Sequence, residues 1–249
     1  MTIVEKLKIP INIGISVFTI GITFYTVMEL MFFLSNPYFK LQITPKGNFW
    51  INATRSLFIN QLLLCAFMLQ HTLFSLPKVK NWLSSIKIDI LQRSIYVIAT
   101  SFTLLLVIRY WRSIPEFVLW NINTNIRMYW WSFVILHFSA WGIIYVGSIC
   151  MDINELLGIK QIYYNMRKLP QPSQYKSNDL NRLYLHMRHP SFLSFIIIFW
   201  GIPFMSLDRL LLASILTVYM YLAWNTDERD HQYQKQQTNR KFYEMNYFK

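Results

Sequence analysis

Long apolar stretches separated by short polar segments dominate the pattern along this chain. A helix needs about 20 apolar residues to cross a hydrocarbon core about 30 Å thick. The pattern therefore predicts membrane-spanning helices, with bounds of about 9–34, 57–76, 90–108, 130–150, 191–207 and 210–224. Because the last two are separated by little more than Asp208 and Arg209, we expect them to form a tight helical hairpin with these charges at its tip.

The composition supports a membrane protein with an all-α fold. Of the 249 residues, 54% are hydrophobic and only 14% are charged, whereas about a quarter of the residues in a soluble domain are charged. We therefore predict a single integral membrane domain over residues 1–249, with about six transmembrane helices. Cys65 and Cys150 both lie inside apolar runs, which favours small packed side chains over a disulfide or a metal site.

Basic residues are distributed unevenly between the two sides of the predicted membrane. The N-terminus, the segments 77–94 and 151–190, and the tail 225–249 hold 17 of the 24 Lys and Arg residues. Cytoplasmic segments carry the excess of Lys and Arg in membrane proteins. We therefore expect both termini to face the cytoplasm or nucleoplasm. A net charge of +12 would also suit nucleic acid, but no nucleic-acid-binding motif accompanies it, so the expected partner of this charge is the lipid bilayer.

The longest polar stretch, residues 151–190, is divided by a segment with two prolines, Pro170 and Pro172. Before that segment, apolar residues at 153, 156, 157 and 163 have near-helical spacing. This spacing is compatible with a helix on the membrane surface. A solvated loop anchored by aromatic residues is an equally good interpretation.

Four polar side chains fall at membrane depth, where a polar group is costly without a partner. They are Glu29, Gln70, His71 and His137. Spans one and two run antiparallel, so Glu29 and His71 are expected near opposite faces and not as a pair. For His137 we favour a hydrogen bond to a Ser or Thr on a neighbouring helix over a functional role. The histidine spacing predicts no metal site.

The hairpin should bring two charged segments together at the same membrane surface. Arg188 and His189 directly precede the fifth span, and the segment 227–230, Asp-Glu-Arg-Asp, follows the sixth. Because a hairpin returns to the side it left, the cationic and anionic clusters should meet there. The alternative is a basic membrane anchor followed by a solvated helical tail.

Several motifs in one order carry a family resemblance. The chain resembles the nurim family of inner nuclear membrane proteins, within the superfamily of isoprenylcysteine carboxyl methyltransferases and membrane thiol methyltransferases. The similar stretches run from the second span to the tail. They are 70–73 (QHTL), 91–96 (LQRSIY), 109–111 (RYW), 114–115 (IP), 155–161 (ELLGIKQ), 163–164 (YY), 188–190 (RHP), 208–213 (DRLLLA), 228–230 (ERD) and 242–243 (FY).

The resemblance implies a pocket for S-adenosylmethionine between the segment before span five and the helix after span six. There Arg188 would hold the cofactor's carboxylate, with His189 beside it, and Glu228 or Asp230 would hold its amino group or ribose. Tyr184 or Tyr233 would lie against the adenine. Glu228 and Arg229 are the candidate catalytic residues, and no metal is expected.

The chain also departs from the active enzymes of that superfamily. Those enzymes commonly have glycines at the positions of Ser194 and Arg182, and a second glutamate at the position of Asp227. Loss of the two glycines removes places where a cofactor can approach the backbone closely.

Two functional hypotheses follow. The first is a structural multi-pass protein of the inner nuclear membrane and the connected endoplasmic reticulum, with a methyltransferase-like fold and nuclear envelope proteins as partners. The second is an S-adenosylmethionine-dependent methyltransferase that acts on a small thiol or a lipophilic thiol or carboxylate.

Overall fold

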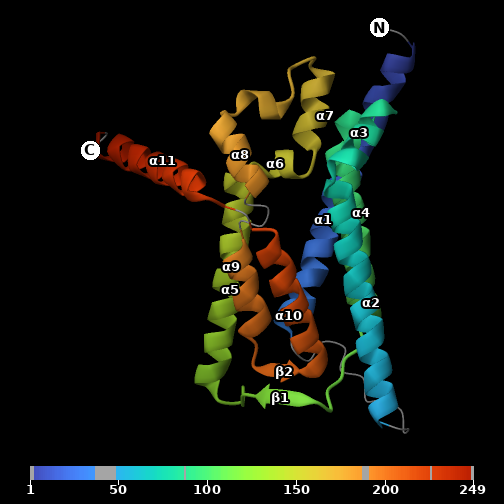
Figure 1. Cartoon of the computed structure of the whole chain (residues 1–249), viewed down its shortest axis with the longest axis vertical. Coiled ribbons are helices and arrows are strands. Elements are labelled where there is room, and N and C mark those ends of the chain that lie inside the picture. Colours follow the sequence, from blue (N-terminus) through green and yellow to red (C-terminus); the bar gives the residue numbers. More distant parts are fainter. Residues whose placement is uncertain (1–2, 37–48, 87, 187–190, 225, 248–249) are drawn as a thin grey trace.

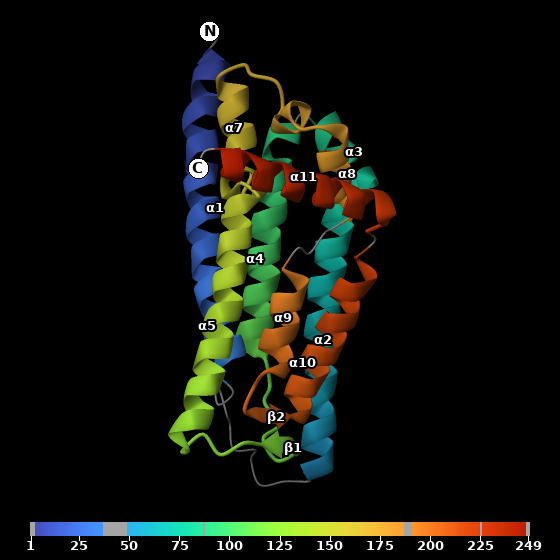
Figure 2. The same cartoon turned by 90° about the vertical axis from the view of Figure 1, so that its left-hand side faces the viewer.

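The computed structural model describes residues 3–36, 49–86, 88–186, 191–224 and 226–247. Four of its helices are long and apolar enough to cross a membrane. They are α1 (Ile3–Ser35), α2 (Phe49–Ser75), α4 (Gln92–Tyr110) and α5 (Arg127–Cys150). These helices correspond to the first four predicted spans, and they run side by side along the long axis of the molecule (Figures 1 and 2). The all-α membrane fold predicted from the apolar pattern is confirmed.

The predicted C-terminal hairpin is present, but its helices are shorter than expected. They are α9 (Phe192–Trp200) and α10 (Leu207–Leu222), which contact each other. Between them, β2 (Phe204–Ser206) pairs antiparallel with β1 (Val118–Asn121). The predicted fifth span, 191–207, was therefore too long, because Gly201 and Pro203 end the helix and the chain then turns into a strand.

The tip of the hairpin also differs from the prediction. It is formed by residues 201–206, whereas Asp208 and Arg209 lie in the first turn of α10 and are buried. Asp208 accepts hydrogen bonds from Trp111 Nε1 at 2.9 Å and from the Ile114 backbone N at 2.9 Å. Arg209 donates to the Asn36 carbonyl at 3.1 Å. Both charges are thus used to join the hairpin to the ends of α1 and α4.

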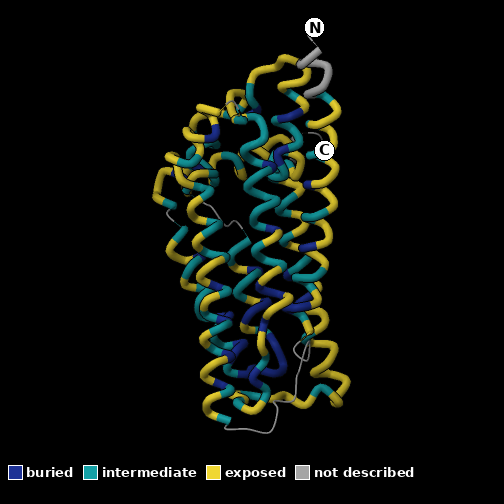
Figure 3. The backbone as a smooth tube through the Cα atoms, turned by 90° about the vertical axis from the view of Figure 1, so that its right-hand side faces the viewer, coloured by how far each residue is buried: buried dark blue, intermediate teal, exposed yellow. Residues whose placement is uncertain are grey.

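The apolar core lies where the hairpin packs among the long helices. α4 contacts both α1 and α2, α5 contacts α9, and α10 contacts α2. Most of the buried positions lie in the half of the molecule away from the N-terminus (Figure 3). The core cluster consists of Phe33, Leu34, Leu64, Val107, Ile108, Trp111, Ala140, Ile198, Phe199, Leu212, Ala213 and Met220. Many apolar side chains on the long helices are instead exposed, as expected for surfaces that face lipid.

Short polar helices gather at the end of the bundle that carries the N-terminus (Figure 1). They are α3 (Pro77–Ser85), η1 (Asp89–Leu91), α6 (Ile153–Leu156), α7 (Ile159–Met166), η2 (Pro172–Tyr175), α8 (Asn178–His186) and α11 (Glu228–Tyr247). Residues 153–166 therefore form two helices and not a loop. α7 runs alongside α1, whereas α11 projects sideways from the bundle (Figures 1 and 2). The described parts of the segments counted as basic thus lie at one end.

Candidate functional site

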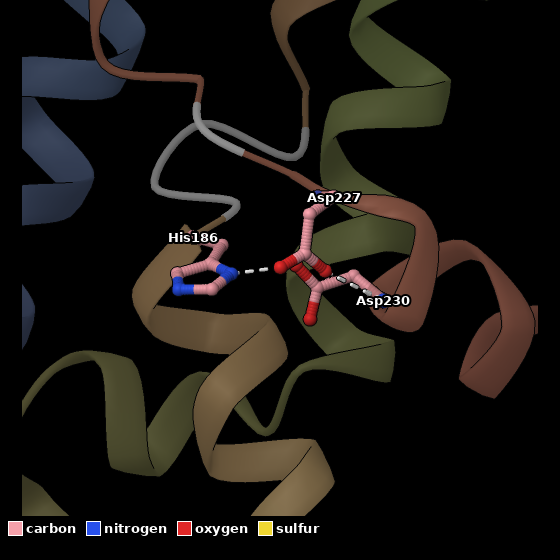
Figure 4. A group of neighbouring side chains, drawn as sticks. All are labelled: His186, Asp227 and Asp230. Atoms are coloured by element: carbon pink, nitrogen blue, oxygen red, sulfur yellow. Dashed lines mark hydrogen bonds and ion pairs between the residues drawn. The ribbon is translucent and has the colours of Figure 1, made fainter.

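The helix before the hairpin and the helix after it are joined by a cluster of ion pairs, which we call the α8–α11 clasp. It consists of Arg182 and His186 on α8, and Asp227 and Asp230 at the start of α11. Figure 4 shows His186 with the two aspartates. His186 Nδ1 lies 2.6 Å from Asp230 Oδ2. Arg182 pairs with Asp227 through Nη2, and its Nε lies 3.9 Å from Asp230 Oδ1. The two chain segments that flank the hairpin therefore meet, as the hairpin prediction required.

Local sequence explains why these four side chains converge. Arg182 and His186 are four residues apart on α8, so they share one helix face. Asp227 Oδ1 accepts from the Asp230 backbone N, and Asp230 Oδ2 accepts from the Asp227 backbone N, both at 3.1 Å. This reciprocal pattern resembles a capping box and starts α11 at a fixed position. The carboxylates are thereby held rigidly opposite α8.

Burial and charge act in opposite directions on Asp230, whose side chain is only 2% exposed. Burial by itself would raise the pKa of this carboxyl group. The hydrogen bonds from His186 and from the Asp227 backbone, together with the charge of Arg182, hold the pKa below its usual value. Asp230 is therefore ionised at neutral pH and serves as the anionic centre of the clasp.

The clasp also contains a set of metal-ligand types. The ligand atoms of His186, Asp227 and Asp230 all lie within 4.8 Å of one another. Arg182, however, contacts Asp227 and lies close to Asp230. The guanidinium group already supplies the cation that two neighbouring carboxylates need, so the arrangement suits an ion-pair network better than a metal centre.

A second polar cluster lies where the α6–α7 turn meets the start of α4. Arg93 Nε donates to the Leu156 carbonyl at 2.7 Å, and its guanidinium lies 5.2 Å from the centroid of the Tyr96 ring. Glu155 Oε1 accepts from Lys176 Nζ at 2.6 Å. Lys176 Nζ in turn lies 4.4 Å from the centroid of the Tyr184 ring. This cluster connects α4, α6 and α8 at the same end of the molecule.

Comparison with known proteins supports a family assignment. A nurim homolog of Drosophila pseudoobscura pseudoobscura is 40% identical over 242 residues, which cover 92% of this chain and 94% of the relative. Human nurim is 38% identical over 184 residues, which cover 73% of this chain and 70% of the human protein. The chain belongs to the nurim family. No protein-family model and no solved structure matches it.

In this nurim-type membrane protein, the residues expected from the resemblance lie in different surroundings. Arg188 and His189 lie outside the described residues. Asp230 is in the clasp, whereas Glu228 is exposed. Arg229 is also exposed and pairs with Asp179 at 2.8 Å.

The two tyrosines of the expected adenine site lie on the facing helices of the clasp. Tyr184 is half-buried on α8, and burial together with nearby acidic groups raises the pKa of its hydroxyl. Tyr233 OH lies 3.4 Å from Ser177 Oγ. Sequence reasoning did not single out Arg182 and His186 as functional residues. Their spacing of four residues, opposite an Asp-x-x-Asp, is the signal that would have identified them.

The polar side chains at membrane depth have partners in the nurim-type bundle. His137 Nδ1 lies 2.9 Å from Ser35 Oγ, so the prediction of a serine or threonine partner is confirmed. His71 lies within 3.0 Å of Tyr96 OH, and Glu29 pairs with Arg109 at 3.1 Å. Gln70 Oε1 accepts from Thr103 at 3.0 Å. These contacts stabilise helix packing and do not by themselves indicate chemistry.

Proposed function

We propose that this nurim-type protein is a structural component of the inner nuclear membrane and the connected endoplasmic reticulum. One observation carries the proposal: most of the charged side chains described at the candidate cofactor site are already paired with other protein side chains, with Glu228 as the exception. Asp230 is bound by His186 and Arg182, and Arg229 is bound by Asp179. A cofactor would have to compete with these pairs, whereas a scaffold benefits from them because they fix α8 and α11 as one surface.

The orientation proposed for this protein follows from its basic residues. The N-terminus, α3, α6 to α8 and α11 lie at one end of the bundle, and these segments hold most of the Lys and Arg. That end would face the nucleoplasm or cytoplasm under the positive-inside rule. Nuclear envelope proteins and anionic lipids are then the partners that this basic end of the bundle can contact.

Tagged protein in cells tests both location and orientation. We expect rim staining of the nucleus, with an N-terminal or C-terminal tag that becomes accessible to antibody only after the inner nuclear membrane is exposed. In sealed microsomes both tags should be cleaved by added protease. A tag inserted at Asn123 is the matched control, because it lies at the opposite end and should be protected. Protected termini, or staining confined to another organelle, would overturn the proposal.

The second candidate function is an S-adenosylmethionine-dependent methyltransferase with a methyltransferase-like fold, acting on a small thiol or a lipophilic thiol or carboxylate. The observation that favours it is the clasp itself, which places the end of α8 beside the start of α11. Arg188 follows α8 by two residues and Glu228 begins α11. The two residues would flank one mouth, where the bound cofactor would supply the methyl group.

Cofactor binding by the detergent-purified protein separates the two functions. The enzyme hypothesis expects saturable binding of S-adenosylmethionine that is lost in both Arg188→Ala and Glu228→Ala. Glu244→Ala is the control, because Glu244 is exposed further along α11 and pairs only with Arg240 among the described residues. Absence of binding at millimolar cofactor in the folded protein would exclude this second function.

A further inference from the structure

The junction between the α6–α7 turn and the start of α4 is packed too closely to be an ordinary loop contact. Gly158 has a φ of 85°, and a Cβ atom there would lie 2.6 Å from Ser94 Oγ and 3.1 Å from Arg93 Cβ. Only glycine fits this position without strain. The contact fixes Glu155 and Gln161, on either side of Gly158, beside the first turn of α4.

Several polar atoms at this junction are buried without a hydrogen-bond partner. They are Glu155 Oε2, Gln161 Oε1 and Gln92 Nε2. The other polar atoms of two of these side chains are used: Glu155 Oε1 accepts from Lys176, and Gln161 Nε2 donates to the Glu155 carbonyl at 3.2 Å. A buried polar group without a partner costs about 1–3 kcal/mol. Such groups are rare in native proteins and call for a specific explanation.

Arg93 adds a positive charge to the same junction, and only part of its guanidinium group is hydrogen-bonded to the described residues. Its Nε donates to Leu156, and the part of the chain that the structure describes offers no acceptor to its two terminal nitrogens. The guanidinium group is held in place by the Tyr96 ring. With Lys176 balanced by Glu155, the junction keeps one net positive charge, together with acceptor oxygens that can receive hydrogen bonds.

The depth of the junction indicates what kind of ligand can reach it. The candidate membrane span that contains α4 begins at Asp89, so Arg93 lies about one turn from the polar end of that span. Phospholipid headgroups occupy this level, and basic pockets between helices on the cytoplasmic side bind anionic headgroups. Arginine is especially suited to phosphate because its planar fork can donate two parallel hydrogen bonds.

We propose that this junction binds the phosphodiester headgroup of an anionic phospholipid. The phosphate would meet the terminal nitrogens of Arg93 and the Gln92 amide. A hydroxyl or ammonium group on the headgroup would donate to Glu155 Oε2 and Gln161 Oε1. An inositol or serine headgroup has the matching chemistry, because each combines a phosphate with neighbouring donors.

Native mass spectrometry of the full-length protein in detergent tests this site. The probes are dioctanoyl phosphatidylinositol and dioctanoyl phosphatidylserine, with dioctanoyl phosphatidylcholine as the neutral comparison. We expect Arg93→Gln to weaken binding of both anionic lipids at least tenfold, and Glu155→Gln to weaken it severalfold. Arg167→Gln is the matched control, because Arg167 is at the same end, is exposed and also lies over a tyrosine ring, that of Tyr163. The affinity of Arg167→Gln for both anionic lipids should stay within twofold of that of the original chain.

A soluble arm distinguishes the two sources of phosphate ester. If inositol 1-phosphate binds as tightly as the lipid, with the same loss in Arg93→Gln, the phosphate site is supported but its occupant is a soluble ester. Equal affinities in all variants, or an equal loss in Arg167→Gln, would overturn the proposal and leave water as the partner of the buried atoms. If Arg93→Gln does not fold, the near-isosteric Glu155→Gln decides in the same assay.

Discussion

At the scale of single residues, the buried carboxylate of Asp208 joins the start of α10 to the segment that follows α4. Asp208 is 1% exposed and accepts hydrogen bonds from Trp111 Nε1, the Ile114 backbone N and Ser206 Oγ. A charge between two apolar runs is normally a solvated turn, so the sequence predicted a hairpin tip. Its burial depends on donors at the end of α4, far away in the chain, which no local pattern encodes.

Replacing Asp208 should therefore be strongly destabilising. In Asp208→Ala three donors in a buried region lose their acceptor, and we expect a loss of about 3–5 kcal/mol. Thermal unfolding of the detergent-purified protein measures this. Glu244→Gln serves as the control, because it removes one charge from the exposed Arg240–Glu244 pair and should change the stability by less than about 1 kcal/mol. Similar melting temperatures for both variants would show that the Asp208 network does not support the fold.

The clasp makes a prediction about pH. Because the folded-state pKa of Asp230 is lowered, its contribution is complete above the ordinary aspartate pKa of about 3.9 and is lost as the pH falls further. The protection factors of the α11 amides, which correct each exchange rate for the intrinsic rate at the same pH, should thus be similar at pH 7 and 5 as far as Asp230 is concerned, and lower at pH 3.5. In Asp230→Asn, exchange should already be fast at pH 7. An α11 that is equally protected in both proteins at pH 7 would mean that the clasp does not hold it.

At the scale of elements, length and apolarity identified the four long helices, because a membrane imposes both on the sequence itself. His137 was also understood correctly, since a polar group at that depth must find a partner. The β1–β2 pair could not be predicted in this way. Phe204–Ser206 lies within an apolar stretch that resembles a helix, and its partner strand lies much earlier in the chain. The clasp was predicted only as a meeting of charges, without Arg182 and His186.

The α6–α7 turn is sensitive to a single added methyl group. In Gly158→Ala the backbone would have to keep a left-handed conformation, and the added Cβ atom would lie 2.7 Å from the Ser94 backbone N. We expect a loss of at least about 1–2 kcal/mol, together with faster hydrogen exchange in α6 and α7. Gly142→Ala is the matched control, because an added Cβ there meets nothing within 4 Å. Its stability should be unchanged or slightly higher; equal behaviour of the two variants would contradict the tight junction.

At the scale of the whole molecule, the fold separates two kinds of surface. The long helices present apolar side chains outward, and the polar helices gather at the end that holds the N-terminus. The α9–α10 hairpin starts from that end and returns to it, which is why α8 and α11 meet. Both the scaffold function and the enzyme function depend on this return, because each needs α8 and α11 on the same side of the membrane.

Cysteine cross-linking in native membranes tests this return most directly. Arg182→Cys and Asp227→Cys are introduced together after Cys65 and Cys150 have been replaced by serine, and the linked peptides are identified by mass spectrometry. We predict efficient linkage of 182 to 227 by a short bismaleimide reagent, because the side chains of Arg182 and Asp227 meet across the space between α8 and the start of α11. A control pair, Arg182→Cys with Lys241→Cys further along α11, should remain unlinked. A 182–227 pair that stays unlinked, with the two cysteines labelled from opposite sides of the membrane, would contradict the account.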